Sequence, residues 1–116
     1  MAKTFRIPAE EIKPLAAGFG SCLASDRITV DGMRVGYMYR EYADDDADSG
    51  WRFFAGDESE EYSADPEHFA IYDVNTIANY DPTIIVWLET SPPCAFERDA
   101  SSGHLIGVQP ADGESS

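Results

Sequence analysis

The sequence has few cysteines, few basic residues and no long hydrophobic run, and each shortage argues against a class of protein. Its two cysteines, Cys22 and Cys94, form no CxxC pair, which predicts reduced thiols rather than a disulfide scaffold. No apolar stretch approaches the ~20 residues that span a membrane. No apolar segment follows the basic N-terminal residues, as a secretory signal requires. We therefore expect a cytoplasmic protein.

Basic residues are scarce relative to acids. The chain has 8 lysines and arginines against 22 aspartates and glutamates, which gives a formal net charge of −14. Because phosphate groups are bound by clustered lysine and arginine, this charge argues against nucleic acid and anionic membrane surfaces as direct partners. It suits a basic protein partner, although surface acids also serve solubility alone.

The length and the apolar content predict one folded domain. The 116 residues include 43% hydrophobic residues and 14 aromatic residues (2 Trp, 6 Tyr and 6 Phe), too many for a disordered acidic chain. We expect a single domain over residues 1–108 and a flexible acidic tail over 109–116.

Helix and strand patterns alternate along the first half of the chain. A short helix is expected over 8–17 and a short strand over 22–24. The runs 27–30 and 33–41 flank Asp31-Gly32, a dipeptide that favours the positive φ values of a hairpin turn. Trp51 and Phe53 then alternate with polar and apolar neighbours, which predicts another antiparallel strand that the loop 42–50 joins to the one before it.

The second half adds short helices and a closing hairpin. Asp73 is expected to cap a helix over 73–79, and Asp81-Pro82 to begin another that runs to residue 89. The runs 94–98 and 104–108 are expected to pair as the last hairpin. The whole pattern predicts an α+β fold: a small single domain with an antiparallel β-sheet and short flanking helices.

The most distinctive feature is an aromatic strand pattern between two acidic runs. Residues 41–73 hold 12 acids and one base, Arg52, which is a local sum of −11. We expect a focused negative surface that docks a basic protein partner, with Trp51 also holding the sheet. The candidate partner-binding residues are acids and aromatic residues of this region: Tyr42, Asp44, Asp45, Asp46, Asp48, Trp51, Asp57, Glu58, Glu60, Glu61 and Tyr62.

Eight aromatic residues are expected mainly in the core, because each has a large apolar area to bury. One or two of them are alternatively exposed anchors for a partner, since tyrosine and tryptophan are enriched at interface hot spots. The aromatic residues considered in this way are Tyr37, Tyr39, Trp51, Phe53, Phe54, Tyr72, Trp87 and Phe96.

No motif assembles a catalytic centre. The run 44–50 fails the ligand positions of an EF-hand loop in either register, and Asp48-Ser49-Gly50 lacks the shielded setting of an aspartic protease. A surface metal site at His68 and a Cys22 nucleophile beside a histidine remain as alternatives to an exposed histidine and a buried cysteine. We expect no enzyme activity, no metal and no cofactor.

Five segments carry longer motifs: SDRITVDG (25–32), VGYMYRE (35–41), DSGWRFFAGDE (48–58), IYDVNTIANYDP (71–82) and AFER (95–98). Over about residues 20–99 they resemble a bacterial family, once a domain of unknown function, that is grouped with predicted immunity proteins of polymorphic toxin systems. The resemblance implies an α+β fold and a role in neutralising a toxin by binding. It supplies no catalytic residues.

These observations favour a small binding protein that neutralises a cognate toxin by occluding it. The first alternative is a housekeeping binding or scaffold domain whose acids only keep it in solution. The second is a small enzyme, which would require a deep pocket where Tyr39, Arg40, Arg52 and a carboxylate converge.

Overall fold

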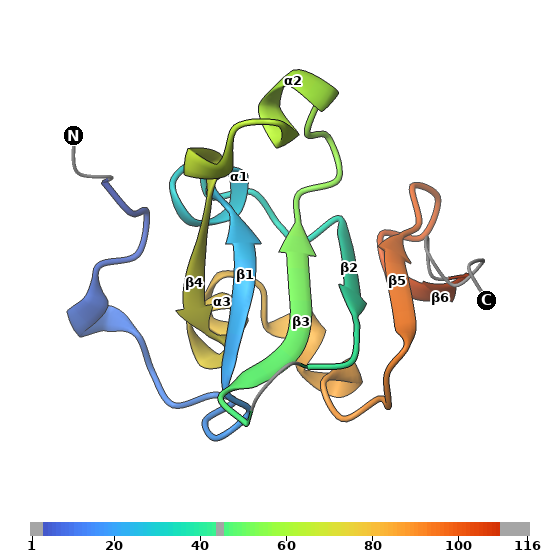
Figure 1. Ribbon diagram of the computed structural model, residues 1–116, viewed down its shortest axis with the longest axis horizontal. Helices are drawn as coiled ribbons and strands as arrows, with labels where there is room; N and C mark the ends of the chain where they lie inside the picture. The colour runs from blue at the N-terminus through green and yellow to red at the C-terminus, as the bar shows by residue number, and fades with distance from the viewer. Residues whose placement is uncertain (1–3, 44–45, 110–116) are drawn as a thin grey trace.

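A six-stranded sheet with short helices forms the protein in the computed structural model, which describes residues 4–43 and 46–109 (Figure 1). The strands lie in the order β4-β1-β3-β2-β5-β6, and each neighbouring pair is antiparallel except β1 and β3. They are β1 (Ser21–Ser25), β2 (Tyr37–Arg40), β3 (Asp48–Phe54), β4 (Phe69–Asp73), β5 (Cys94–Arg98) and β6 (Leu105–Val108). The helices are η1 (Ala9–Glu11), α1 (Asp26–Thr29), α2 (Glu60–Ser63), η2 (Pro66–His68), α3 (Val74–Tyr80) and η3 (Pro82–Trp87). The predicted α+β fold is confirmed.

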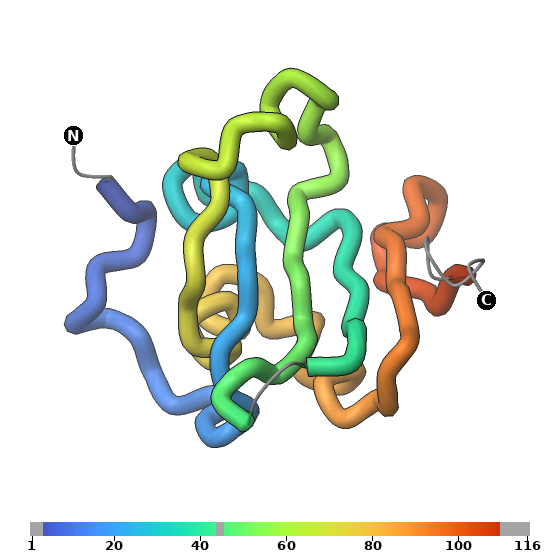
Figure 2. The backbone as a smooth tube through the Cα atoms, viewed as in Figure 1, coloured from blue at the N-terminus to red at the C-terminus, as the bar shows by residue number. Residues whose placement is uncertain are grey.

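The parallel pair results from the path of the chain at the centre of the sheet. The chain runs along β1, turns through α1, and returns along β2 (Figure 2). It then passes along β3, which lies between β1 and β2 and pairs with both. The prediction that the loop 42–50 joins two sheet neighbours is confirmed. The sheet is antiparallel, as predicted, at every neighbouring pair except β1 and β3.

The predicted hairpin around Asp31-Gly32 is wrong, because residues 26–29 form the helix α1. The Ser25 hydroxyl accepts a hydrogen bond from the backbone N–H of Arg27 at 3.0 Å and so caps this helix. The Gly32 N–H then donates to the carbonyl of Ile28 at 3.0 Å, and Gly32 takes a φ of 80°. The Asp-Gly dipeptide therefore ends a helix instead of joining two strands.

The predicted helix over 8–17 is reduced to η1, a single 3-10 turn. Pro14 lacks a backbone N–H, and the neighbouring backbone groups bond to asparagine side chains of α3 instead. The Lys13 N–H donates to Asn79 Oδ1 at 2.9 Å, and the Leu15 N–H donates to Asn75 Oδ1 at 2.7 Å. These bonds attach the N-terminal segment to α3 without a regular helix.

The later elements follow their sequence patterns more closely. The Asp73 carboxylate caps α3 by accepting from the Asn75 N–H at 2.8 Å, as predicted. The helix that begins after Asp81 is the 3-10 helix η3, which ends at Trp87 rather than at residue 89. The closing hairpin of β5 and β6 is confirmed.

The core lies on one face of the sheet, where α1 and α3 cover the strands from behind in Figure 1. Trp51 and Phe53 project into it from β3, both fully buried, with ring centroids 5.9 Å apart. The Trp51 indole N–H donates to the carbonyl of Leu88 at 3.1 Å, which fixes the end of η3 against the sheet. Trp51 therefore holds the fold and is unavailable to a partner, which removes it from the candidate partner contacts.

A buried ion pair links the helix layer to the sheet. Asp81 is 2% exposed, and its carboxylate lies 2.6 Å from the Arg98 guanidinium of β5. The same carboxylate accepts from the Val35 N–H at 3.0 Å and caps η3 through the Thr83 N–H at 3.1 Å. The Arg98 guanidinium in turn donates to the carbonyls of Val35 at 3.0 Å and Gly103 at 2.8 Å. One carboxylate and one guanidinium thus satisfy four backbone groups in three separate segments.

Replacing Arg98 with methionine is expected to lower the free energy of unfolding by about 3–5 kcal/mol, because it leaves the Asp81 carboxylate buried without its counter-ion. Urea unfolding followed by tryptophan fluorescence measures this change. Glu89→Gln is the control, since it alters an exposed acid and is expected to change stability by less than about 0.5 kcal/mol. Equal stability of the two variants would contradict a structural role for the pair.

Candidate functional site

Over residues 4–43 and 46–109, no helix covers the face of the sheet opposite the core at β1, β3 and β2, which lie in front in Figure 1. Strand register places its side chains in rows. One row runs across three strands from Glu97 through Tyr37 to Phe54. The second row crosses five strands, and its members are Ala95, Tyr39, Arg52, Leu23 and Ile71. We call these two rows the open face.

Aromatic rings form a continuous series across the open face. Tyr39 stacks on Phe54 with centroids 5.9 Å apart, and Tyr37 lies within about the same distance of both, at 6.0 and 6.1 Å. Phe54 also meets Phe69 of β4 edge to face at 5.9 Å. Tyr62 continues the series with a centroid 6.1 Å from Phe69. The open-face members of the series are half-buried rather than enclosed, so part of each ring surface faces solvent.

The two acidic runs lie at opposite ends of the open face. The loop between β2 and β3 lies at one end and α2 at the other, with β3 between them (Figure 1). The seven residues of β3, at ~3.3 Å each, separate the ends by about 20 Å. This distance exceeds the Debye length of about 8 Å at physiological ionic strength. The expected single negative surface is therefore two separate ones, which we call the loop end and the α2 end.

At the loop end, acids surround the one base of the region. The Arg52 guanidinium lies 2.8 Å from the carboxylates of both Asp48 and Glu41. The hydrogen bond from Arg52 lowers the pKa of Asp48 from 3.8 to about 2, helped by the Gly50 N–H. Asp46 is exposed nearby, and Tyr42 is 72% exposed. The candidate residues Asp44 and Asp45 lie outside the described residues.

At the α2 end, two of the candidate acids serve local structure. Asp57 pairs with Arg27, whose hydrogen bond holds the pKa of this carboxyl below its ordinary value. The Glu58 carboxylate accepts from the N–H groups of Ala55 at 2.8 Å and Gly56 at 3.0 Å. Glu60 and Glu61 lie in the first turn of α2 and are exposed.

The aromatic candidate of the α2 end, Tyr62, is half-buried, unlike the exposed Tyr42 of the loop end. Its ring stacks on His68 with centroids 3.9 Å apart, and burial raises the pKa of its hydroxyl. The ring face toward His68 is therefore occupied. Tyr62 remains at the border of the open face through its contact with Phe69.

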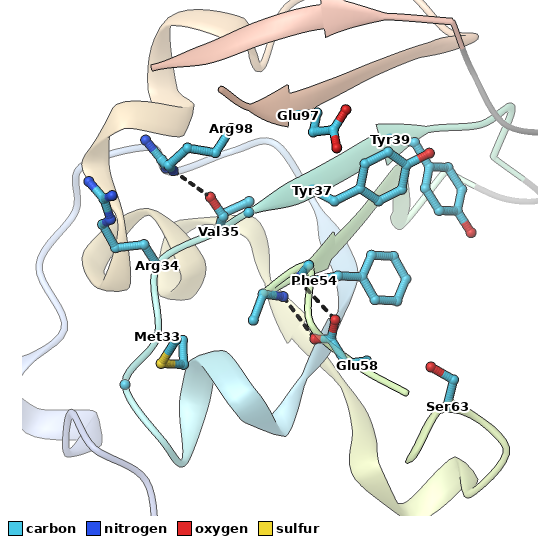
Figure 3. Close-up of a pocket in the computed structure, with 14 residues that line it drawn as sticks. Met33, Arg34, Val35, Tyr37, Tyr39, Phe54, Glu58, Ser63, Glu97 and Arg98 are labelled. Atoms are coloured by element: carbon cyan, nitrogen blue, oxygen red, sulfur yellow. Dashed lines mark hydrogen bonds between the residues drawn. The ribbon is translucent and has the colours of Figure 1, made fainter. Parts of the chain in front are cut away.

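A pocket of about 880 Å³ opens at the α2 end of the open face (Figure 3). Tyr37, Tyr39 and Phe54 form one wall. Its floor includes Gly36, where a Cβ atom would lie 1.9 Å from the carbonyl oxygen of Ala55. Only glycine permits this close approach of the two backbone segments beside the aromatic wall.

The convergence of Tyr39, Arg40 and Arg52 that the enzyme alternative requires is not formed. Arg40 lies on the core face, where its guanidinium donates to the carbonyls of Ser49 at 2.9 Å and Thr90 at 2.7 Å. Arg52 and Tyr39 lie on the open face, so these groups do not converge. Cys22 is 1% exposed, and burial raises its thiol pKa, which suppresses the nucleophilic thiolate. Over residues 4–43 and 46–109, no three His, Cys, Asp or Glu side chains group as metal ligands.

Part of this site is not predicted by the sequence pattern. Glu97, Tyr37 and Phe54 form its first row, but Glu97 had no role in the predicted surface and the two aromatic residues were expected mainly in the core. Strand alternation within 35–41 and 51–55 separates core-facing from open-facing positions. It does not show which faces of different strands coincide, because that depends on register.

The geometry defines a small α+β protein with an aromatic, carboxylate-bearing sheet face. Residues 22–109 match the family model of the Immunity protein Imm33 domain. The chain belongs to this immunity protein family, which confirms the resemblance found in the sequence and gives the chain an immunity-type role in general. Neither the curated proteins nor the solved structures yield a match. No helix of the described residues has the length and apolar character to cross a membrane.

The pKa of Asp48 gives a pH-dependent prediction. Because the folded value is depressed, its stabilisation is complete above 3.8 and is lost as the pH falls through about 2. The stability advantage of the native chain over Asp48→Asn should therefore shrink by about 1–2 kcal/mol between pH 5 and pH 2. Urea unfolding of both proteins at each pH measures this, with Asp46→Asn as the control for removing an exposed acid. A constant difference across the range would contradict the assignment.

Proposed function

We propose that this protein neutralises a cognate bacterial toxin by binding it with the open face, and that it does so without catalysis. The observation that carries the proposal is the uncovered aromatic series from Tyr37 to Phe69 in a chain of the immunity family. Aromatic side chains anchor interfaces because they bury a large area with few rotatable bonds. Their position at the centre of a sheet, between two acidic ends, matches an anchor surrounded by a polar rim.

The size of the face sets how much of the protein the toxin contacts. The five strands that the open face crosses, at ~4.8 Å spacing, are about 19 Å wide, and with strands of about 17 Å the flat area is roughly 330 Å². A stable interface buries about 800 Å² on each partner. The toxin therefore also contacts the ends of the sheet, where the acids lie.

The acids indicate a basic toxin surface. The net charge of −14 attracts a basic partner before contact, and complementary charge speeds association more than it strengthens the final complex. Glu60 and Glu61, exposed on α2, are suited to this steering. Asp48 and Asp57 are already paired with arginines of the chain and contribute less.

The housekeeping alternative makes a different prediction for the same residues. If the protein were a housekeeping domain with no toxin partner and acids that serve only solubility, a toxin encoded beside it would neither bind it nor be neutralised by it. The aromatic series favours the immunity role, because solubility alone does not account for half-buried rings on an uncovered face.

Co-expression with a toxin encoded beside this protein is expected to restore growth and to yield an isolable complex. Tyr39→Ala should weaken the complex by about ten- to a hundredfold, because it removes a ring from the centre of the open face. Val86→Ala is the control, since Val86 is 76% exposed on η3, away from this face. Calorimetry or surface plasmon resonance gives both dissociation constants. Growth rescue that is unaffected by Tyr39→Ala, with unchanged affinity, would place the interface elsewhere.

Reversing the charge of Glu60 and Glu61 to lysine is expected to slow association with a basic toxin by about tenfold at low salt. The same reversal at Glu10 and Glu11, exposed on η1, changes the net charge equally and serves as the control. Stopped-flow association rates at several salt concentrations distinguish local steering from overall attraction. If both double variants lose the same rate, only the net charge acts.

A further inference from the structure

We infer that the pocket at the α2 end of the open face receives the guanidinium of an arginine from the toxin partner. This inference rests on the proposed function for the identity of the partner. The pocket holds about 880 Å³, within the range of sites that enclose a ligand group. It therefore accommodates one long side chain with part of the backbone that carries it.

The aromatic wall is suited to a cation. Tyr37 and Phe54 face the hollow with ring centroids 6.1 Å apart, and Tyr39 stacks beside them (Figure 3). The face of an aromatic ring carries negative electrostatic potential and attracts a guanidinium placed over it. Arginine suits this wall better than lysine because its planar group also stacks on rings.

Two carboxylates flank the same wall. Glu97 is the cross-strand neighbour of Tyr37 and is exposed, so its oxygens are accessible to a donor in the pocket. Glu58 lies on the other side of the wall, beside Phe54 (Figure 3). Its carboxylate already accepts from the Ala55 and Gly56 N–H groups, which holds it in place. A guanidinium over the rings would thus lie between two negative groups.

The basic residues of the pocket lie apart from this wall. Arg98 and Arg34 occupy the opposite side in Figure 3. Arg98 is committed to the Asp81 carboxylate and to the carbonyl of Val35, so its charge is compensated within the fold. Arg34 is exposed on the loop before β2. The lining is therefore polarised, with its carboxylates at the aromatic end, where the cation is placed.

The test uses the full chain and two small probes, without any toxin. N-acetyl-arginine methylamide is titrated into ¹⁵N-labelled protein, and N-acetyl-citrulline methylamide serves as the neutral probe of nearly the same shape. We expect saturable shifts of the Gly36, Tyr37 and Gly56 amides, with half-saturation at about 1–10 mM for the arginine probe. Binding of the citrulline probe should be at least about fivefold weaker, because it lacks the charge.

Two single variants test whether a carboxylate of the pocket recognises the charge of the arginine probe. Glu97→Gln should weaken arginine binding by about three- to tenfold, whereas Glu89→Gln, at another exposed glutamate, should leave it unchanged. Equal binding of the two probes, an equal effect of the two variants, or no saturation by about 50 mM would overturn the inference. Such a failure leaves the proposed function standing. Arginine binding together with failed toxin neutralisation would support a cation site but overturn the toxin as its source.

Discussion

The buried ion pair between Asp81 and Arg98 is the constraint on which the site depends. Both partners bind the backbone of Val35, one through its N–H and the other through its carbonyl. This double attachment fixes the segment that enters β2, and with it the contact of Gly36 against Ala55 that forms the pocket floor. Because a buried charge without its partner is strongly destabilising, the pair requires η3, β2 and β5 to assemble together.

Aromatic residues have different roles on the two faces of the sheet. Trp51 and Phe53 stabilise the fold because they are enclosed by the helices, while their neighbour Phe54 points the other way and meets Tyr39. A period of two along one strand thus supplies both a core and a candidate binding surface. A substitution on the open face can therefore change binding without removing a core contact, so the binding proposal can be tested by mutation.

The parts of the fold that depend on local chemistry are predictable from the sequence. Asp73 and Asp81 were identified as caps because an aspartate before a helical pattern satisfies free N–H groups, and the structure places both at helix starts. The helix α1 was missed because Asp-Gly is typical of both a hairpin turn and a helix end. The Ser25 hydroxyl caps α1 by accepting from the Arg27 N–H, which favours the helix end over the hairpin turn. Burial of Ile28 on the core side also favours the helix.

The site itself depends on long-range register and was less accessible. The two acidic runs are evident in the sequence. Their distance apart depends on β3 beginning at Asp48 and on the position of α2 after it, which the structure establishes. Glu97 joins Tyr37 only because β5 pairs with β2, an adjacency that no local pattern encodes. The charge that first suggested a basic partner is thus divided between two ends. The aromatic wall beside Glu97 is where we propose that one cationic group binds, a position that the net charge alone does not specify.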